Sequence, residues 1–381
     1  MLQSSDSRAH SDSDKWHKYS GTNILPMWIA DTEFLAAPAI NDALQSRIEH
    51  GVFGYGYTQP RFISGIIHHC RSQYDWHVDA DWIIPLTGCV PGLNFSRAIA
   101  YLRGKKRAVT VEPVYPHLRK TSAILPGYEN AGSPCILENG RWVPDFDALE
   151  ANINDETGLL LLCHPHNPIG RAYTDTELAR YHAIAKKYDL LVCSDEIHCD
   201  IVLNGTRHRP FASLDDDARD RTITLMAMSK TYNIAGLSCA FAIIPNATLR
   251  QEYRRVSAGM TGDVNVLGMT ASIAALEHGE KWRRKMITYL RENAQLAEKR
   301  INATGKLHMT PVEATFLAWI DARGLGVDNP QRYFEEHGVG MNDGADFGAP
   351  GFVRLNFGCP REMLEEALER IEIAVTKLTH A

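Results

Sequence analysis

The chain has 381 residues, of which 44% are apolar and 23% charged, a composition ordinary for a globular protein with one large or two moderate cores. Forty basic residues against 46 acidic ones give a net charge of −6, which argues against a nucleic-acid-binding surface. No apolar stretch approaches the roughly 18 residues that a membrane-spanning helix needs, so we expect neither nucleic acid nor membrane as a partner.

The first 15 residues are rich in Ser and Asp and contain no apolar stretch of the kind found in secretory signals. We therefore expect residues 1–15 to form a mobile arm and the protein to be cytoplasmic.

The cysteine and histidine patterns do not indicate a metal site. Most of the eight cysteines lie in apolar, strand-like segments, and none forms a Cys-x-x-Cys pair, which predicts buried free thiols rather than disulfides or zinc. His164 and His166 stand in a Pro-bracketed turn, where we interpret them as structural residues rather than metal ligands.

Short apolar strands alternate with amphipathic helices through the middle of the chain. Residues 174–188, for example, carry apolar side chains at helical spacing. This alternation predicts a mostly parallel sheet covered by helices on both faces. The Asn139-Gly140 and Asn204-Gly205 pairs predict local hairpins beside it. The expected strands are 107–111, 158–163, 190–194, 222–226 and 239–244.

The C-terminal third reads differently, with long helices at about 265–303 and 361–379 flanking strand-like segments at 315–320 and 352–357. We expect a smaller α+β domain here, completed by the apolar residues 23–30. The predicted division is an N-terminal arm and part of the small domain at 1–45, a large domain at 46–275, and the rest of the small domain at 276–381.

Lys230 stands in a stretch of small residues directly after one of the expected strands. Apolar surroundings lower the pKa of a lysine amine and make it nucleophilic toward an aldehyde. Asp195 and Asn167 follow two other strands, and Gly88-Cys89-Val90-Pro91-Gly92 opens a helix whose first N–H groups can hold an anion. Each feature alone is compatible with an ordinary cap or turn. Ligands collect at the carboxyl ends of such strands, so we expect the four to share one cleft.

These groups match the needs of pyridoxal phosphate: an amine for its aldehyde, a carboxylate for its pyridine nitrogen and N–H donors for its phosphate. Ordered motifs along almost the whole chain resemble those of the fold-type I pyridoxal-phosphate enzymes of the aminotransferase class I/II group. Within that group they are most similar to the cystathionine β-lyases (C–S lyases) of the MalY/PatB type. The motifs include Thr87-Gly88-Cys89-Val90-Pro91, His166-Asn167-Pro168-Ile169-Gly170, Ser194-Asp195-Glu196-Ile197-His198, Ser229-Lys230-Thr231-Tyr232-Asn233 and Gly351-Phe352-Val353-Arg354-Leu355-Asn356.

The resemblance implies a fold-type I α/β fold with a mostly parallel, seven-stranded sheet in the large domain. It implies that Lys230 forms the Schiff base with the cofactor and later removes the substrate Cα proton. Asp195 would pair with the pyridine nitrogen, and Tyr115 would stack on the ring. Asn167 would bind the ring 3-oxygen, with His198 beside the same atom.

The resemblance also assigns the two anion sites. The backbone amides of Cys89 and Val90, after Gly88, would hold the phosphate together with the Ser229 hydroxyl. Arg354 would bind the substrate α-carboxylate in a bidentate pair.

Tyr55 resembles the tyrosine that in this family reaches the phosphate of the neighbouring subunit, which implies a homodimer with shared active sites. Tyr57 is the alternative for that role.

Three positions depart from the family pattern. Ala227 stands where many relatives have a phosphate-binding serine, and Ser238 stands where aspartate aminotransferases have an arginine. Asp31-Thr32-Glu33 replaces the subfamily's usual Asp-Met-Asp. These departures leave the cofactor's affinity and the preferred substrate open.

The implied reaction is α,β-elimination of L-cystathionine or a related cysteine S-conjugate to a thiol, pyruvate and ammonia. An aminotransferase would use every residue named above, so that activity stays open as an alternative. A third possibility is a regulatory or binding homodimer with residual lyase activity.

Overall fold

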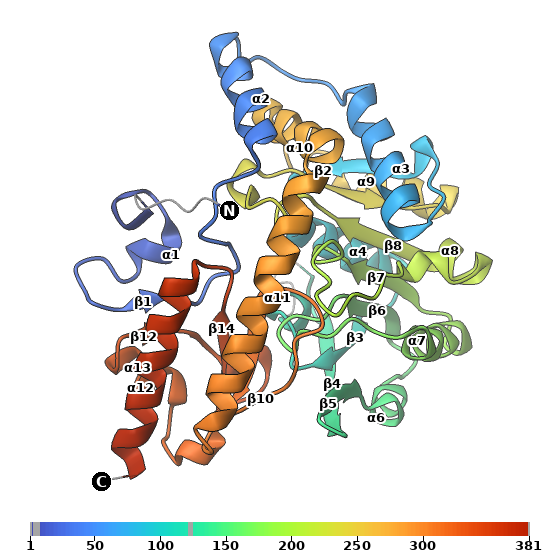
Figure 1. The fold of residues 1–381 in the computed structure, drawn as a ribbon. Helices are drawn as coiled ribbons and strands as arrows, with labels where there is room; N and C mark the ends of the chain where they lie inside the picture. Colours follow the sequence, from blue (N-terminus) through green and yellow to red (C-terminus); the bar gives the residue numbers. More distant parts are fainter. Residues whose placement is uncertain (1, 3–7, 121–124, 380–381) are drawn as a thin grey trace.

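The computed structural model describes residues 2, 8–120 and 125–379. Its main element is an eight-stranded sheet in the order β2-β9-β8-β7-β6-β3-β4-β5 (Figure 1). The four pairs from β8 to β4 are parallel, and the pairs toward both edges are antiparallel. The strands are β2 Ile83–Leu86, β3 Arg107–Glu112, β4 Glu129–Glu138, β5 Arg141–Pro144, β6 Thr157–Cys163, β7 Leu191–Asp195, β8 Thr222–Met226 and β9 Ala240–Ile243.

The sheet has one strand more than the seven expected. The additional strand is β5, which the Asn139-Gly140 turn folds back onto β4 as the predicted hairpin. Both turn residues have positive φ, 50° and 75°, as a tight hairpin turn requires. The hairpin predicted at Asn204-Gly205 was wrong, because Val202 before it forms an isolated bridge with the distant Ala314.

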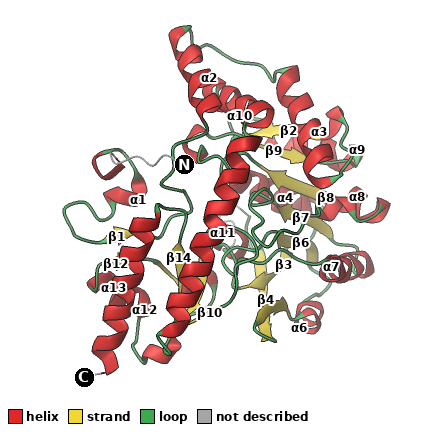
Figure 2. Cartoon of the chain, viewed as in Figure 1, coloured by secondary structure: helices red, strands yellow, loops and turns green. Residues whose placement is uncertain are grey.

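Helices cover both faces of this sheet, as the alternating pattern predicted (Figure 2). Leu159 and Leu161 of β6 belong to a core formed with α4 and α9, whereas Leu160 and Leu162 belong to a core formed with α6 and α7. Burial on both faces explains why these strands are continuous apolar runs. The helices are α2 Pro38–Glu49, α3 Pro60–Tyr74, α4 Cys89–Leu102, α5 Pro116–Arg119, α6 Phe146–Ala151, α7 Asp175–Lys187, α8 Asp216–Arg221, α9 Ala247–Ser257 and α10 Val266–His278.

A smaller antiparallel sheet in the order β10-β11-β14-β13 packs against α11 and α13. Near it β1 pairs in parallel with β12, so the N-terminal segment joins the C-terminal elements as expected (blue and red in Figure 1). The division at residues 45 and 275 stays a prediction. These elements are β1 Leu25–Pro26, β10 His308–Met309, β11 Leu317–Asp321, α12 Pro330–Glu336, β12 Val339–Gly340, β13 Asn342–Asp343, β14 Phe352–Asn356, α11 Glu280–Ala303 and α13 Arg361–Thr379.

The helical region predicted at 265–303 consists of two helices, α10 and α11, separated at Gly279. A Cβ atom at Gly279 would lie 2.4 Å from Cε1 of Tyr232, so this close approach requires glycine.

The N-terminal arm is structured over its described part, and the expectation of a mobile arm was wrong there. A short 3₁₀ helix spans Arg8–His10, and α1 spans Asp14–His17. The Lys15 side chain is only 1% exposed, with its Nζ 2.7 Å from Oε1 of Glu33. The Ser- and Asp-rich sequence of the arm contains no pattern that predicts an ion pair between Lys15 and Glu33. The prediction for residues 1 and 3–7 lies outside the described residues.

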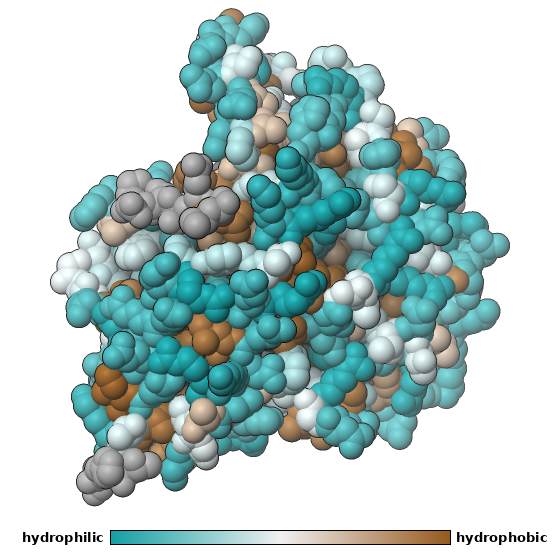
Figure 3. Space-filling model, in the orientation of Figure 1, coloured by the Kyte–Doolittle hydropathy of each residue, from teal (hydrophilic) through white to brown (hydrophobic). Residues whose placement is uncertain are grey.

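All eight cysteines are buried and free, as predicted. None of the helices in the described part of the chain is both long and apolar enough to cross a membrane. On the face in Figure 3, hydrophilic residues cover most of the surface and hydrophobic ones form separate small areas.

Candidate active site

The ends of β6 and β7 and the loop after β8 open on a cavity of about 340 Å³. Nine of the eleven predicted site residues line it: Cys89, Val90, Tyr115, Asn167, Asp195, His198, Ser229, Lys230 and Arg354. Gly88 directly precedes helix α4 beside them. Tyr55 does not line the cavity, and its side chain is fully exposed.

The Lys230 side chain lines the cavity, and its amine donates a hydrogen bond to the backbone oxygen of Ala30 at 2.7 Å. Burial lowers the pKa of this amine, although the negative charge of Asp31 acts in the opposite direction. The residues after it turn back through Asn233, whose φ is 58° and whose side chain donates to the backbone oxygens of Thr32 and Phe34. The loop after Lys230 therefore holds in place the segment that begins with Ala30, whose backbone oxygen accepts the hydrogen bond from the Lys230 amine.

Asp195 is the last residue of β7, and burial raises the pKa of its carboxyl to about 7. The backbone N–H of Ile197, 3.4 Å from Oδ1, and the positive charge of Lys230 partly oppose this shift. The buried carboxylate has no ion-pair partner within hydrogen-bonding distance among the described residues. A protonated nitrogen bound in the cavity would stabilise its charged form.

Arg354 lies on β14 and is 4% exposed. It donates from Nη1 to Oδ1 of Asn167 at 2.9 Å and from Nη2 to Oδ1 of Asn342 at 2.7 Å and the Trp28 oxygen at 2.9 Å. In the described part of the chain it has no carboxylate partner, and its Nε has no hydrogen-bond acceptor. Burial lowers its pKa to about 10. Such an unpaired guanidinium is suited to bind an incoming anion.

His198 and Tyr115 are neutral groups of the cavity wall. Burial lowers the pKa of His198 to about 3, and its Nδ1 has no partner among the described residues. Burial raises the pKa of Tyr115 to about 12, and its backbone N–H donates to the oxygen of Asn167 at 3.0 Å. Both can donate or accept a hydrogen bond without carrying charge.

The start of α4 lines the cavity, where Cys89 and Val90 supply backbone N–H groups that the helix itself leaves without acceptors. Ser229, with its hydroxyl, also lines the cavity. The departure at Ala227 is explained by packing, because this side chain is buried in the core between the sheet and α4 and does not line the cavity.

Several residues that line the cavity were not predicted from the sequence. Asn342 is one: it pairs with Arg354 across β13 and β14, a relationship visible only once the two strands are aligned. Trp28, Asp346 and Phe347 likewise come from segments without a recognisable motif, whereas Ala30 directly precedes the family position Asp31-Thr32-Glu33. The one feature of the sequence that could have indicated Asn342 as a site residue is the polar pair Asn342-Asp343, close to the apolar strand that contains Arg354.

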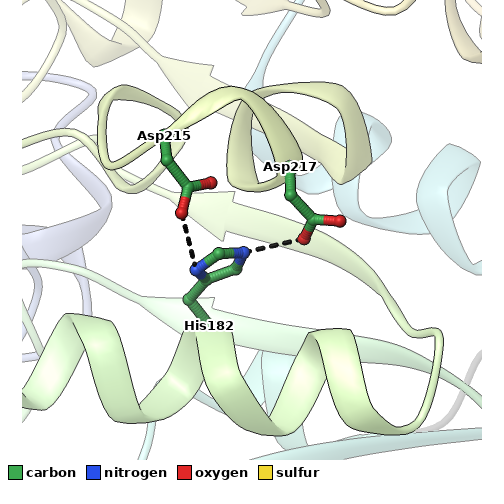
Figure 4. Close-up of side chains that lie close together, drawn as sticks. All are labelled: His182, Asp215 and Asp217. Atoms are coloured by element: carbon green, nitrogen blue, oxygen red, sulfur yellow. Dashed lines mark hydrogen bonds and ion pairs between the residues drawn. The ribbon is translucent and has the colours of Figure 1, made fainter.

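A separate cluster contains His182, with Nε2 2.7 Å from Asp217 and Nδ1 3.4 Å from Asp215 (Figure 4). Arg221 also binds Asp217 through two hydrogen bonds, and Asp215 accepts one from the N–H of Ala218 at the start of α8. Since both carboxylates already have partners, we interpret the cluster as a link between α7 and α8.

Three comparisons identify similar proteins. The family model described as aminotransferase class I and II matches residues 30–371. The chain is 32% identical to cystathionine beta-lyase PatB of Bacillus subtilis (strain 168) over 97% of this chain and 98% of that protein. Its fold is similar to the crystal structure of OvoB, with 45% identity, a TM-score of 0.94 and 98% of each chain covered. It is also similar to cystalysin from Treponema denticola, whose structure contains pyridoxal 5′-phosphate, with 27% identity, a TM-score of 0.92 and coverage of 99% and 98%.

Proposed function

Because the chain belongs to the aminotransferase class I and II family, we propose that it is a pyridoxal-phosphate-dependent lyase that breaks the Cβ–S bond of L-cystathionine or related L-cysteine S-conjugates. The products are a thiol, pyruvate and ammonia. The observation that carries the proposal is one cavity that holds the Lys230 amine, the Asp195 carboxyl and the unpaired Arg354 guanidinium. Near-full-length similarity to a protein named cystathionine beta-lyase favours elimination over amino transfer.

The cavity fits the cofactor at each of its reactive positions. The start of α4 and the Ser229 hydroxyl offer donors for the phosphate, and Lys230 offers an amine for the aldehyde. Asp195 offers a carboxylate for the pyridine nitrogen. Pairing with that protonated nitrogen would lower the raised pKa of the Asp195 carboxyl toward its ordinary range. The unpartnered Nδ1 of His198 is a further group free to bind it. Asn167 and Tyr115 complete the proposed set, at the ring oxygen and the ring face.

The proposed role of each residue follows from the charge and burial of its side chain. Pyridoxal phosphate, when bound, supplies the aldehyde for an amine and a ring that stabilises negative charge at the substrate Cα. Arg354 binds the substrate α-carboxylate through two parallel hydrogen bonds. Lys230, whose burial favours the neutral amine, takes the proton from Cα, and the thiol leaves as the Cβ–S bond breaks. Asp195 keeps the proton on the pyridine nitrogen.

We also propose a homodimer in which Tyr55 serves the partner's site. Val52, Phe53, Tyr55 and Tyr57 are all exposed in one loop between α2 and α3. Four neighbouring apolar or aromatic side chains in water are typical of a surface that another subunit covers. Tyr55 lies outside its own cavity, which is consistent with a role in the partner's.

The test uses the purified protein loaded with pyridoxal phosphate and supplied with L-cystathionine. The proposal predicts pyruvate and free thiol in equal amounts without any added 2-oxo acid. A keto acid formed only when a 2-oxo acid acceptor is present would instead establish an aminotransferase.

A matched pair of variants then tests the assigned base. Lys230→Ala should lose roughly 10²–10⁴-fold in turnover, the contribution of a positioned acid–base group. The exposed Lys306→Ala should keep full activity. A regulatory dimer without a catalytic role would keep its cellular effect in Lys230→Ala.

A further inference from the structure

Of the Asp, Glu, Lys and Arg side chains among the described residues, four line the cavity: Lys230, Asp195, Arg354 and Asp346. The proposed reaction uses the first three. Asp346 is exposed, and it has neither a hydrogen bond nor an ion pair with any residue that the structure describes. Its charge is thus the one among the four without a role in the proposed reaction.

Asp346 stands on a fixed segment. It belongs to a 3₁₀ helix at Gly344–Phe347, whose start is capped by Asp343 through a 2.9 Å hydrogen bond from the N–H of Ala345. The next residue, Phe347, is buried and lies under Arg354, whose Cζ is 4.7 Å from the ring centroid. The Phe347 oxygen also accepts a 3.0 Å hydrogen bond from the N–H of Val114. The backbone that carries Asp346 is therefore anchored beside the guanidinium that we assign to the substrate carboxylate.

The lining of the cavity suits an apolar chain that ends in a positive charge. Trp28, Ile29, Pro116 and Phe347 line the same cavity, whose exposed lining is mainly apolar, as thioether carbons require. Aromatic faces and an unpaired carboxylate both favour a cation, and the carboxylate disfavours an anion.

We propose that Asp346 selects L-cysteine S-conjugates whose leaving thiol carries a cationic group, such as a primary amine. This inference rests on the proposed lyase function and specifies its substrate class. Arg354 binds the α-carboxylate, and Asp346, which lines the same cavity on the segment beside Arg354, binds the cation at the end of the side chain. The Cα proton is removed and the Cβ–S bond breaks, so the amine leaves as part of the thiol; water then converts the remaining fragment to pyruvate and ammonia.

Binding tests this selection without the elimination step. L-Lysine, L-norleucine and L-2-aminoadipate resemble conjugates with cationic, neutral and anionic ends, but they have CH₂ in place of sulfur and no leaving group. Calorimetry on the cofactor-loaded protein should show that L-lysine binds about fivefold more tightly than L-norleucine, the ratio expected for one partly exposed ion pair. L-2-Aminoadipate should bind more weakly than L-norleucine.

Two matched variants complete the binding test. Asp346→Asn should abolish the preference for L-lysine, whereas Asp328→Asn, at an exposed position outside the cavity, should keep it. Equal binding of L-lysine and L-norleucine to the wild type, or a preference that persists in Asp346→Asn, would overturn the assignment.

Turnover separates this inference from the proposed function. S-(2-Aminoethyl)-L-cysteine should be cleaved with a kcat/KM about fivefold above that of S-propyl-L-cysteine, and Asp346→Asn should equalise the two. Equal cleavage by the wild type would reject the selectivity and leave the lyase standing. No thiol from either conjugate or from L-cystathionine would reject the lyase, and the L-lysine binding ratio would still decide the role of Asp346.

Discussion

Arg354 donates a hydrogen bond from Nη1 to Oδ1 of Asn167 at 2.9 Å, joining β14 of the smaller sheet to the turn after β6 of the larger one. The two residues are 187 positions apart in sequence. One has the proposed role of binding the substrate carboxylate, and the other that of binding the ring oxygen of the cofactor. A shift of the smaller sheet relative to the larger would therefore disturb both sites together.

Arg354→Lys tests the bidentate carboxylate site. Lysine keeps the positive charge but lacks the planar fork, so we expect kcat/KM to fall about 100-fold, the value of roughly two charged hydrogen bonds, mainly through KM. Steady-state kinetics with L-cystathionine measures this. Arg323→Lys, on an exposed arginine paired with Asp321, is the control and should change neither constant. An unchanged KM in Arg354→Lys would remove Arg354 from substrate binding.

Asp195 should make the cofactor-free protein less stable as the pH rises. Burial raises the pKa of its carboxyl in the folded protein from 3.8 to about 7. Between these values the folded protein holds a proton that the unfolded chain has released, so the free energy of unfolding falls as pH rises through this window. The side chain of Asn cannot ionise. From pH 5 to pH 8 the free energy of unfolding of the wild type should therefore fall by about 2–3 kcal/mol relative to that of Asp195→Asn.

Urea denaturation of both cofactor-free proteins at the two pH values measures this difference. The same variant should lose lyase activity, because it cannot hold the proton on the pyridine nitrogen. Parallel pH dependence in the two proteins would show that Asp195 has an ordinary pKa.

Three of the residues that the sequence placed correctly in the cavity share one property. Lys230, Asp195 and Asn167 each stand at or after the end of an apolar strand, and such strands can be recognised from their composition, so their ends can be predicted to meet. Asn342 and Asp346 follow no such strand: β13 has two residues, and its pairing with Arg354 depends on tertiary structure.

The prediction of a mobile N-terminal arm was wrong for a related reason. Lys15 is an ordinary polar residue in a polar segment unless its partners at Asp31 and Glu33 are known. The same contacts give a structural account of the departure at Asp31-Thr32-Glu33, because Glu33 also accepts hydrogen bonds from Arg8 and Trp16.

Lys15→Met tests whether this buried pair fixes the arm. Its partner Glu33 is 4% exposed and would keep Arg8 as its only charged partner among the described residues, so its charge would be less well compensated and we expect up to about 3 kcal/mol of destabilisation. The control is Lys18→Met, whose 3.3 Å pair with Glu335 is partly exposed and should contribute less than about 1 kcal/mol. Urea denaturation measures both. Equal effects of the two variants would mean that the arm is held by other contacts.

Tyr55 is 106% exposed in the single chain, and the proposed dimer predicts that it works in the partner's site. Tyr55→Ala and Lys230→Ala should each be inactive or nearly so as pure dimers. In a hybrid dimer, however, one site combines the intact Lys230 of one subunit with the intact Tyr55 of the other. Random assembly of equal amounts makes half of the dimers hybrid with one intact site each, so activity should recover to about a quarter of the wild-type value.

The measurement is thiol release after the two variants are unfolded and refolded together with pyridoxal phosphate, beside each variant refolded alone. Lys306→Ala in place of Lys230→Ala provides the control, since that mixture should lose activity only through the sites that lack Tyr55. If the mixture of Tyr55→Ala and Lys230→Ala shows only the sum of the separate activities while size-exclusion chromatography shows dimers, Tyr55 acts within its own subunit or not at all.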